Sequence, residues 1–416
     1  MITDIKLLCQ KAKAASRVMA ILDSKLKSRA IRSMANALIK SSSHIIGENA
    51  KDVGNARKNN ISKALIDRLT LDEKRIKAMA DSLIDISKLK NPVGRIMETR
   101  IRPNALLIKK VSVPIGVILV IYESRPNVTS DCVGLALKSG NCIILRGGSD
   151  AINSNTAIFE ILNKEASKAG LPAGAITMIT DTDRSVVKEL IAQEGLIDLV
   201  MPRGGESLIR EVSRSSRIPV IKHYKGVCHI YVDEFADLDM ALLICYNAKV
   251  QRPGVCNAME TMLVNKKIAK KFLSRMIRIF KEAGVEIRGC PQTKKIVKNI
   301  NGAHEDDWYR EYLDLVLSVK VVASVNEAIE HIMKYGSYHS DAIITGDKKT
   351  AAKFLNEVDS ACVYVNASTR FTDGGQFGKG AEIGISTDKI HARGPVGLEE
   401  LTSYKYVVYG KGQIRK

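Results

Sequence analysis

The spacing of apolar residues separates a helical N-terminal part from a long part in which strands and helices alternate. Over residues 2–22, apolar side chains recur at alternating three- and four-residue steps, which predicts an amphipathic helix. Similar patterns continue to Leu89, and Asn91, Pro92 and Gly94 then end them. The first fifth of the chain is therefore predicted to be helical.

Strand patterns begin after this helical part. Apolar and polar residues alternate over 99–113 around a Pro-Asn turn, which predicts a β-hairpin. From residue 115, short β-branched segments are apolar at every position, as strands covered on both faces should be. The predicted strands of this region are 116–122, 142–145, 175–179, 197–201, 219–222 and 229–232. The helices predicted between them are 132–138, 153–168, 184–193 and 206–213.

A second alternating region follows Asp233. Its predicted helices lie near 239–249, 266–283, 325–335 and 348–357, and its predicted strands near 260–264, 316–323, 342–345 and 361–365. Strand–helix alternation implies parallel, doubly wound sheets with right-handed crossovers, so we predict an α/β fold with two such domains. The segment 367–399 is rich in glycine and polar residues, and irregular stretches of this length are usually functional.

Composition places the chain among ordinary globular proteins. Of its 416 residues, 45% are apolar and 26% charged, which excludes a disordered chain or a membrane bundle. The longest nearly uncharged stretch, 111–122, contains Pro114 and Gly116 and is shorter than the roughly 20 residues of a membrane span. The charged N-terminus argues against a secretory signal, and eight cysteines without a CxxC pair indicate free thiols. We therefore predict a cytoplasmic protein without a membrane partner.

The basic charge of the chain is concentrated in two segments. The formal net charge is +19, and residues 1–110 hold 24 basic and 10 acidic residues while residues 262–300 hold 11 and 2. Nucleic-acid binding would need a basic face, but only 5% of the residues are aromatic and available to stack on bases. Solvated helix faces explain the charge better, and a positive field would also steer anionic substrates. A basic nucleic-acid-binding protein is kept as the alternative from another class.

One cysteine has the surroundings of a nucleophile. Cys256 lies in a polar Pro-Gly turn between a predicted helix and strand, with Arg252 close by in sequence, and nearby cations favour the thiolate. A plain loop cysteine is the alternative. Cys290 precedes a proline in a basic segment that we expect to be exposed, and the other cysteines lie in apolar periodic segments. None of the seven histidines has zinc-ligand spacing, so no metal site is predicted.

Two strand ends carry glycines that suit a nucleotide. The predicted strand 142–145 ends in Arg146 and Gly147, and the strand 197–201 leads into Arg203, Gly204 and Gly205 before a helix. Glycines at such turns allow phosphates to approach backbone N–H groups and a helix N-terminus. Tight connections without a ligand are the alternative.

Several long motifs resemble a known family. The order of Asn127, the Gly204-Gly205 turn and Cys256 resembles the aldehyde dehydrogenase superfamily. Within it, the resemblance is to the gamma-glutamyl phosphate reductases. The motifs that carry it are 122–129, 251–260, 328–343, 365–374, 378–387 and 393–398. The resemblance implies an aldehyde-dehydrogenase-like fold and NADPH-dependent reduction of L-glutamyl 5-phosphate to L-glutamate 5-semialdehyde and phosphate, the second step of proline synthesis.

The resemblance also implies roles for residues. Cys256 would form a thioester with the acyl group, and Asn127 with the backbone N–H of Cys256 would stabilise the oxyanion. The cofactor-binding residues would be Arg146, Gly147, Gly204, Gly205 and Glu311, of which Glu311 would hold the nicotinamide ribose and Arg146 the 2′-phosphate of NADP. Hydrolytic members place a glutamate base where this chain has His223, so water should attack the thioester poorly.

The substrate's charged groups need polar partners. We expect its α-carboxylate and amino group at Asn366 and Arg370, because the planar fork of an arginine pairs with a carboxylate. Arg125 or Arg252 would hold the phosphate. Interdomain salt bridges are the alternative role of these arginines.

The predicted domain plan follows the resemblance. It comprises an NADP-binding domain over 1–98 and 114–228, a catalytic domain over 229–398, and an oligomerisation hairpin and strand over 99–113 and 399–416. We also expect the chain to form homo-oligomers and to act on a small-molecule substrate, with glutamate kinase as a candidate partner. Oxidation of a different aldehyde is the alternative activity.

Overall fold

The computed structural model describes residues 4–123 and 125–415, so Ser124 of the motif 122–129 lies outside the described residues. The chain forms two compact units. Unit 1 comprises residues up to Lys222 together with Gly378–Gly384 and Val396–Lys416, and unit 2 comprises His223–Phe377 and Ile385–Pro395. The observed division falls between Lys222 and His223, six residues before the predicted one.

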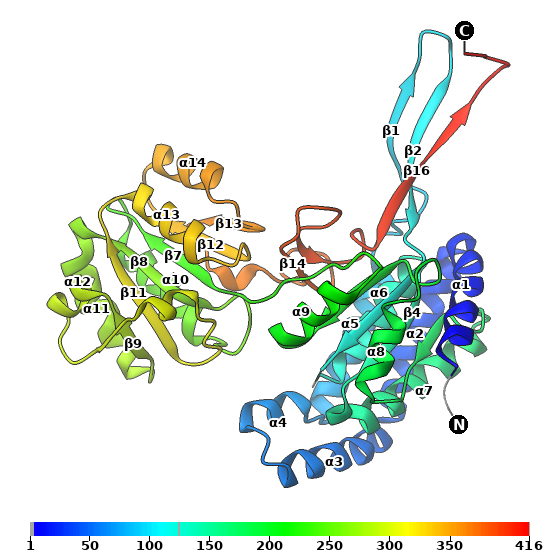
Figure 1. The fold of residues 1–416 in the computed structure, drawn as a ribbon, viewed down its shortest axis with the longest axis horizontal. Coiled ribbons are helices and arrows are strands. Elements are labelled where there is room, and N and C mark those ends of the chain that lie inside the picture. The colour runs from blue at the N-terminus through cyan, green and yellow to red at the C-terminus, as the bar shows by residue number, and fades with distance from the viewer. Residues whose placement is uncertain (1–3, 124, 416) are drawn as a thin grey trace. The chain divides into compact units, whose positions relative to one another are not determined.

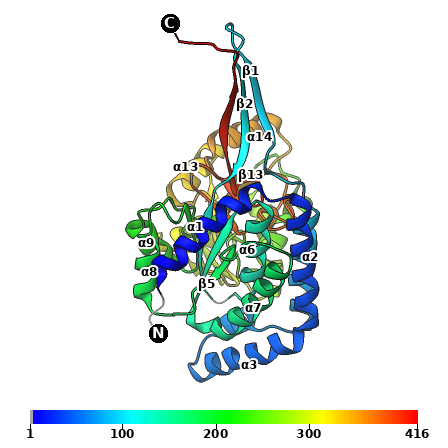
Figure 2. The same ribbon diagram turned by 90° about the vertical axis from the view of Figure 1, so that its right-hand side faces the viewer.

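Unit 1 begins with the predicted helical layer. Its helices are α1 (Ile5–Ile21), α2 (Ser24–Lys40), α3 (Ser42–Lys58), α4 (Lys63–Leu69) and α5 (Glu73–Lys88) (Figures 1 and 2). The side chain of Asp4 accepts a hydrogen bond from the N–H of Leu7 and so forms the N-cap of α1, while residues 2 and 3 of the predicted helix lie outside the described residues.

The core of unit 1 is a four-stranded parallel sheet in the order β5-β4-β3-β6. Its strands are β5 (Ile176–Met178), β4 (Cys142–Gly147), β3 (Val117–Tyr122) and β6 (Leu199–Arg203). The later helices of the unit are α6 (Asn127–Lys138), α7 (Ile152–Lys168), α8 (Arg184–Leu190) and α9 (Glu206–Ser215), with the short η1 (Ser149–Ala151) before α7. The predicted strand 219–222 is wrong: only an isolated bridge joins Val220 to Val200 there, and Pro219 has no N–H to donate.

Unit 2 contains a seven-stranded sheet in the order β10-β9-β11-β8-β7-β12-β13, and every pairing is parallel. The strands are β7 (Cys228–Val232), β8 (Met259–Asn265), β9 (Glu286–Gly289), β10 (Asn301–Gly302), β11 (Val316–Val322), β12 (Ser340–Ile344) and β13 (Cys362–Val365). Its helices are α10 (Leu238–Val250), α11 (Lys266–Glu282), α12 (Pro291–Ile296), α13 (Val325–Tyr335) and α14 (Lys348–Glu357), with the short η2 (Glu305–Tyr309) and η3 (Thr369–Phe371).

The sheet of unit 2 is apolar on both faces, as predicted. One cluster packs the sheet against α10 and α11, with Phe272 and Phe280 fully buried, and a second packs it against α13 and α14 around Phe354. Sequence patterns missed β9, α12 and β10, which are too short to show a periodicity. They also misplaced Cys290, which is buried beside Trp308 rather than exposed.

Unit 1 also contains an antiparallel three-stranded sheet in the order β1-β2-β16 (Figure 1). The predicted hairpin is confirmed as β1 (Ile96–Ile101) and β2 (Leu107–Pro114), and β16 (Thr402–Tyr409) pairs with β2 along its whole length. These strands extend away from the helices of the unit as a ribbon (Figure 2). The short strands β14 (Gly384–Ser386) and β15 (Gly394–Val396) pair with each other within the irregular 367–399 segment.

Candidate active site

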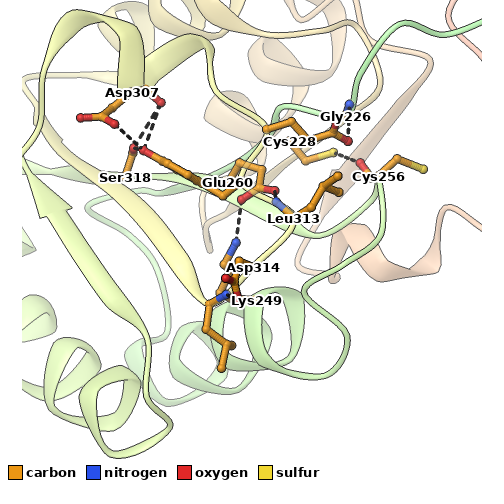
Figure 3. Close-up of polar contacts among 12 residues, drawn as sticks. Gly226, Cys228, Lys249, Cys256, Glu260, Asp307, Leu313, Asp314 and Ser318 are labelled. Atoms are coloured by element: carbon orange, nitrogen blue, oxygen red, sulfur yellow. Dashed lines mark hydrogen bonds and ion pairs between the residues drawn. The ribbon is translucent and has the colours of Figure 1, made fainter. Parts of the chain in front are cut away.

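Cys256 lies half-buried in the turn between α10 and β8, at the carboxyl end of the preceding helix. Two neighbours fix the backbone of this turn. The thiol of Cys228, on β7, donates to the carbonyl oxygen of Cys256 over 3.2 Å, and the side chain of Cys256 points away from Cys228 (Figure 3). A β-carbon at Gly226 would overlap the same carbonyl group, so only glycine fits there. The turn is therefore held rigidly while its thiol stays accessible.

Two imidazoles reach the Cys256 thiol. One ligand atom from each of His223, Cys256 and His339 lies within 4.8 Å of the others. The rings of His223 and His339 meet edge to face, with centroids 5.6 Å apart. The expectation of no metal site was based on sequence spacing, which cannot detect residues that the fold gathers from three distant segments.

Arg370 is bonded to the Cys256 turn. Its Nε donates to Oε1 of Gln251 over 3.0 Å, and a terminal nitrogen donates to Oδ1 of Asn257, the residue after Cys256. Burial, and next the charge of Arg252, lower the pKa of Arg370, while Cys256 raises it. Arg252 itself is exposed. The turn thus contains one cation, Arg252, and is bonded to a second, Arg370.

The amide of Asn366 bonds to the backbone of Thr345. Its backbone has φ of 54°, its Oδ1 accepts from the N–H of Thr345 over 2.9 Å, and its Nδ2 donates to the carbonyl of Thr345 over 2.9 Å. The amide therefore continues the backbone pairing between the ends of β12 and β13. In this structure the amide shapes the loop, and its role in substrate binding stays a prediction.

Glu311 is linked to the Cys256 turn through Gly226. Its Oε1 accepts the N–H of Gly226 over 2.9 Å, and Gly226 packs against the carbonyl of Cys256. The loop that carries Glu311 is thereby tied to the segment beneath the thiol.

A buried ion pair that the sequence did not reveal closes the base of the turn. Nζ of Lys249, in the last turn of α10, lies 2.6 Å from Oε2 of Glu260 on β8, and both side chains are fully buried (Figure 3). Oε1 of Glu260 accepts the N–H of Leu313 over 3.1 Å. Burial raises the pKa of Glu260 to about 7 despite the nearby ammonium group. The pair joins the two ends of the Cys256 turn, and the Leu313 contact attaches the Glu311 loop to it.

In unit 1, the predicted Gly204-Gly205 turn leads into α9. Gly205 is the N-cap of α9, and its N–H donates to Oε2 of Glu123 over 2.9 Å. A β-carbon at Gly204 would overlap the same carboxylate, whereas Gly205 has open space beside it. The Glu123 carboxylate thus accepts a hydrogen bond at the N-terminus of the helix, where the backbone favours an anion.

Arg146 is turned toward the protein rather than outward. It is buried, and one terminal nitrogen donates to the carbonyls of Thr182 and Asp183 over 2.6 and 3.2 Å. Its other terminal nitrogen donates to the carbonyl of Gly147 over 3.2 Å. A β-carbon at Gly147 would overlap the amide of Asn155. In this structure Arg146 supports the strand-end turn.

The remaining predicted residues of unit 1 lie at the start of α6. Asn127 is exposed as the first residue of α6, and its Nδ2 donates to Oδ2 of Asp131 over 3.2 Å. Arg125 is half-buried in the segment before it. Both follow the carboxyl end of β3, where parallel sheets bind their ligands.

Comparisons with known proteins agree with this fold. The aldehyde dehydrogenase family matches residues 2–294, and the chain belongs to that family. Members of the family are oxidoreductases that use a nicotinamide cofactor.

Its relatives narrow the assignment to the gamma-glutamyl phosphate reductases. The chain is 58% identical over 413 residues to a gamma-glutamyl phosphate reductase of Caldanaerobacter subterraneus, covering 99% of this chain and 100% of the relative. The crystal structure of the enzyme of that name from Thermotoga maritima matches with a TM-score of 0.96 and 48% identity, covering 99% and 100% of the two chains. The yeast structure of that name is 31% identical with a TM-score of 0.56, and each chain is covered completely.

Proposed function

We propose that this protein reduces L-glutamyl 5-phosphate to L-glutamate 5-semialdehyde and phosphate with NADPH, as a step of proline synthesis in the cytoplasm. The observation that carries this proposal is the 58% identity over nearly the whole chain to proteins named gamma-glutamyl phosphate reductase. The accessible thiol of Cys256, in a rigid turn that contains Arg252 and is bonded to Arg370, supports it, since acyl transfer needs such a nucleophile.

Cys256 performs the covalent step. Its thiolate attacks the acyl phosphate, the C–O bond to phosphate breaks, and a thioester remains on the sulfur. NADPH, when bound, supplies the hydride that reduces this thioester. Cys256 then leaves as thiolate when the tetrahedral adduct collapses to the aldehyde. Asn127 and the N–H of Cys256 are the proposed oxyanion donors, and losing one such donor typically costs ~10²–10³ in rate.

The residues present suit a nicotinamide dinucleotide. The N–H of Gly205 at the N-terminus of α9 donates to the Glu123 carboxylate, and in the Gly204-Gly205 turn it would donate to a phosphate in place of that carboxylate. Glu311 is the proposed ligand of the nicotinamide ribose. Arg146 and Gly147 remain proposed cofactor-binding residues. Arg146 would bind a phosphate of the cofactor directly only by giving up its three bonds to backbone carbonyls; with these bonds kept, it acts by supporting the turn.

Substrate recognition is assigned to the arginines. Arg370 is the proposed partner of the α-carboxylate, and Arg252 or Arg125 that of the phosphate group. His223 replaces a hydrolytic base, so the acyl group passes between sulfur and phosphate rather than to water. Homo-oligomerisation through β1, β2 and β16 is also proposed, as is delivery of the substrate by a glutamate kinase.

A coupled assay tests the proposal. Glutamyl phosphate generated in place by a glutamate kinase should cause loss of NADPH absorbance only when this protein is added, and Cys256→Ala should remove that signal. Oxidation of glutamate semialdehyde in the reverse direction should require inorganic phosphate. Oxidation of other aldehydes without phosphate, with no reduction of glutamyl phosphate, would favour the alternative aldehyde dehydrogenase activity instead.

A further inference from the structure

The cluster of His223, Cys256 and His339 has the composition of a zinc site. One sulfur and two ring nitrogens lie within 4.8 Å of one another. Ligand atoms of a tetrahedral zinc ion lie roughly 3.5 Å apart, given Zn–S near 2.3 Å and Zn–N near 2.1 Å. Modest side-chain rotations would therefore bring the three atoms to bonding distance.

The outer contact of His223 matches that of a metal-ligating histidine, and His339 has two outer contacts, with Ser340 and Cys228. Metal-ligating histidines usually bond through their other ring nitrogen to a carboxylate, a backbone carbonyl or water, which fixes the ring. Nδ1 of His223 lies 2.9 Å from the carbonyl oxygen of Ile385, and Nδ1 of His339 lies 2.9 Å from Oγ of Ser340. The carbonyl can only accept, so Nδ1 of His223 donates to it, and Nε2 is the nitrogen left to bind a cation. Nδ1 of His339 likewise contacts Ser340, so Nε2 is the ring nitrogen that we assign as the metal ligand.

Burial and ligand type suit a soft divalent cation at this place. His339 is fully buried, while His223 and Cys256 are half-buried, so the cluster has one inner wall and an accessible side. Three protein ligands leave a fourth tetrahedral position for water, as in zinc sites that exchange their ligands. The ligand set is one thiolate and two neutral imidazoles, which zinc and cobalt accept and which magnesium and calcium do not.

We propose that His223, Cys256 and His339 form a binding site for a soft divalent cation such as Zn²⁺, which reversibly blocks the Cys256 nucleophile. On binding, the S–H bond of Cys256 breaks, its proton goes to solvent, and the sulfur bonds to the metal without any change of oxidation state. The thiolate in the complex cannot attack an acyl phosphate. The inhibitory consequence rests on the proposed function, whereas the binding itself does not.

Cobalt spectroscopy tests the binding without any enzyme assay. Co²⁺ added to the reduced, metal-free protein should give a thiolate-to-cobalt charge-transfer band at one equivalent per chain. Cys256→Ser should abolish that band. His223→Gln and His339→Gln should each weaken Co²⁺ and Zn²⁺ binding at least ~10-fold, since even outer-contact partners are worth 10–100-fold in metal affinity. His44→Gln changes an exposed histidine of unit 1 and serves as the matched control with unchanged binding.

Inhibition gives a second, separable readout. Zn²⁺ should inhibit the reductase reaction, a chelator should restore it, and bound Zn²⁺ should protect Cys256 from alkylation by iodoacetamide. Absence of the charge-transfer band in the unmodified protein, its survival in Cys256→Ser, or unchanged affinity in both histidine variants would overturn the site. A cobalt band in a protein that fails to reduce glutamyl phosphate would overturn the proposed function and leave the metal site standing.

Discussion

At the scale of single residues, the environment of Cys256 explains why this thiol differs from the other seven. All eight cysteines are free, but seven are buried, and burial raises the pKa of Cys142 to about 12 and that of Cys9 to about 11. Cys256 is instead half-buried, on a turn that contains Arg252 and is bonded to Arg370. A nucleophile needs such access and charge, whereas a buried thiol behaves as a small apolar side chain.

Cys256→Ala should abolish turnover while the fold and NADPH binding remain, as measured by the coupled assay, circular dichroism and fluorescence titration. Cys290→Ala is the control and should keep its activity. It should nevertheless lose about 1–3 kcal/mol of stability, because the N–H of Val321 donates to the Cys290 sulfur over 3.4 Å. Residual activity above a few per cent in Cys256→Ala would disprove the thioester mechanism.

Substitutions of Arg370 and Arg252 should change different kinetic parameters. Arg370→Lys should raise the KM for glutamate semialdehyde and lower the melting temperature, because lysine cannot replace the bonds to both Gln251 and Asn257. Arg252→Lys, at an exposed position, should mainly raise the KM for phosphate in the reverse reaction. Equal losses of both parameters, with lowered stability in both variants, would show that the arginines are structural.

At the scale of elements, α10 and β8 flank the Cys256 turn on its two sides. The pair of Lys249 and Glu260 joins them at the base, and Glu260 also holds the loop that follows Glu311 through Leu313. Breaking a buried pair by removing one partner typically costs 3–5 kcal/mol, because the other charge stays buried alone. The pair therefore links the stability of this region to the position of the proposed catalytic thiol.

Glu260→Gln should change how stability depends on pH. The folded protein holds the pKa of Glu260 near 7, above its ordinary 4.5, so the folded state binds this proton more tightly than the unfolded chain. This group's contribution is present below pH 4.5 and is lost as the pH rises through 7. Urea unfolding between pH 5 and 8 should show a falling contribution in the unmodified protein that is absent in Glu260→Gln. Parallel pH profiles for the two proteins would contradict this.

The sheet of β1, β2 and β16 exposes apolar side chains that a single chain does not cover. Ile101, Tyr406 and Val408 are 75%, 60% and 53% exposed. Val408→Asp should therefore shift the protein toward monomers in light scattering while leaving its melting temperature nearly unchanged at low concentration. Val18→Asp, at an exposed position on α1, is the control. An oligomer of unchanged size in Val408→Asp would place the subunit interface elsewhere.

At the scale of the whole molecule, the net charge of +19 should act through long-range electrostatics. A positive field raises the encounter rate of anionic substrates, and salt screens it with a Debye length of about 10 Å at 0.1 M. The kcat/KM for glutamyl phosphate should fall several-fold as salt rises from low to physiological concentration, while kcat stays constant. A kcat/KM indifferent to salt, combined with salt-sensitive binding to generic DNA, would instead support the nucleic-acid alternative.

The search for membrane-spanning helices, over the part of the chain that the structure describes, found none with the required length and hydropathy.

The sequence by itself determined the α/β class, the hairpin, most strand positions and the cysteine that differs from the rest. These features follow from local periodicity and from a polar turn, which depend only on residues close together in the chain. Only the tertiary structure showed that His223 and His339 meet at Cys256, that Lys249 and Glu260 close its turn, and that Asn366 and Arg146 bond to backbone groups. The physical reason is that parallel strands bring together residues far apart in the chain, and no short-range pattern records which side chains then share a place.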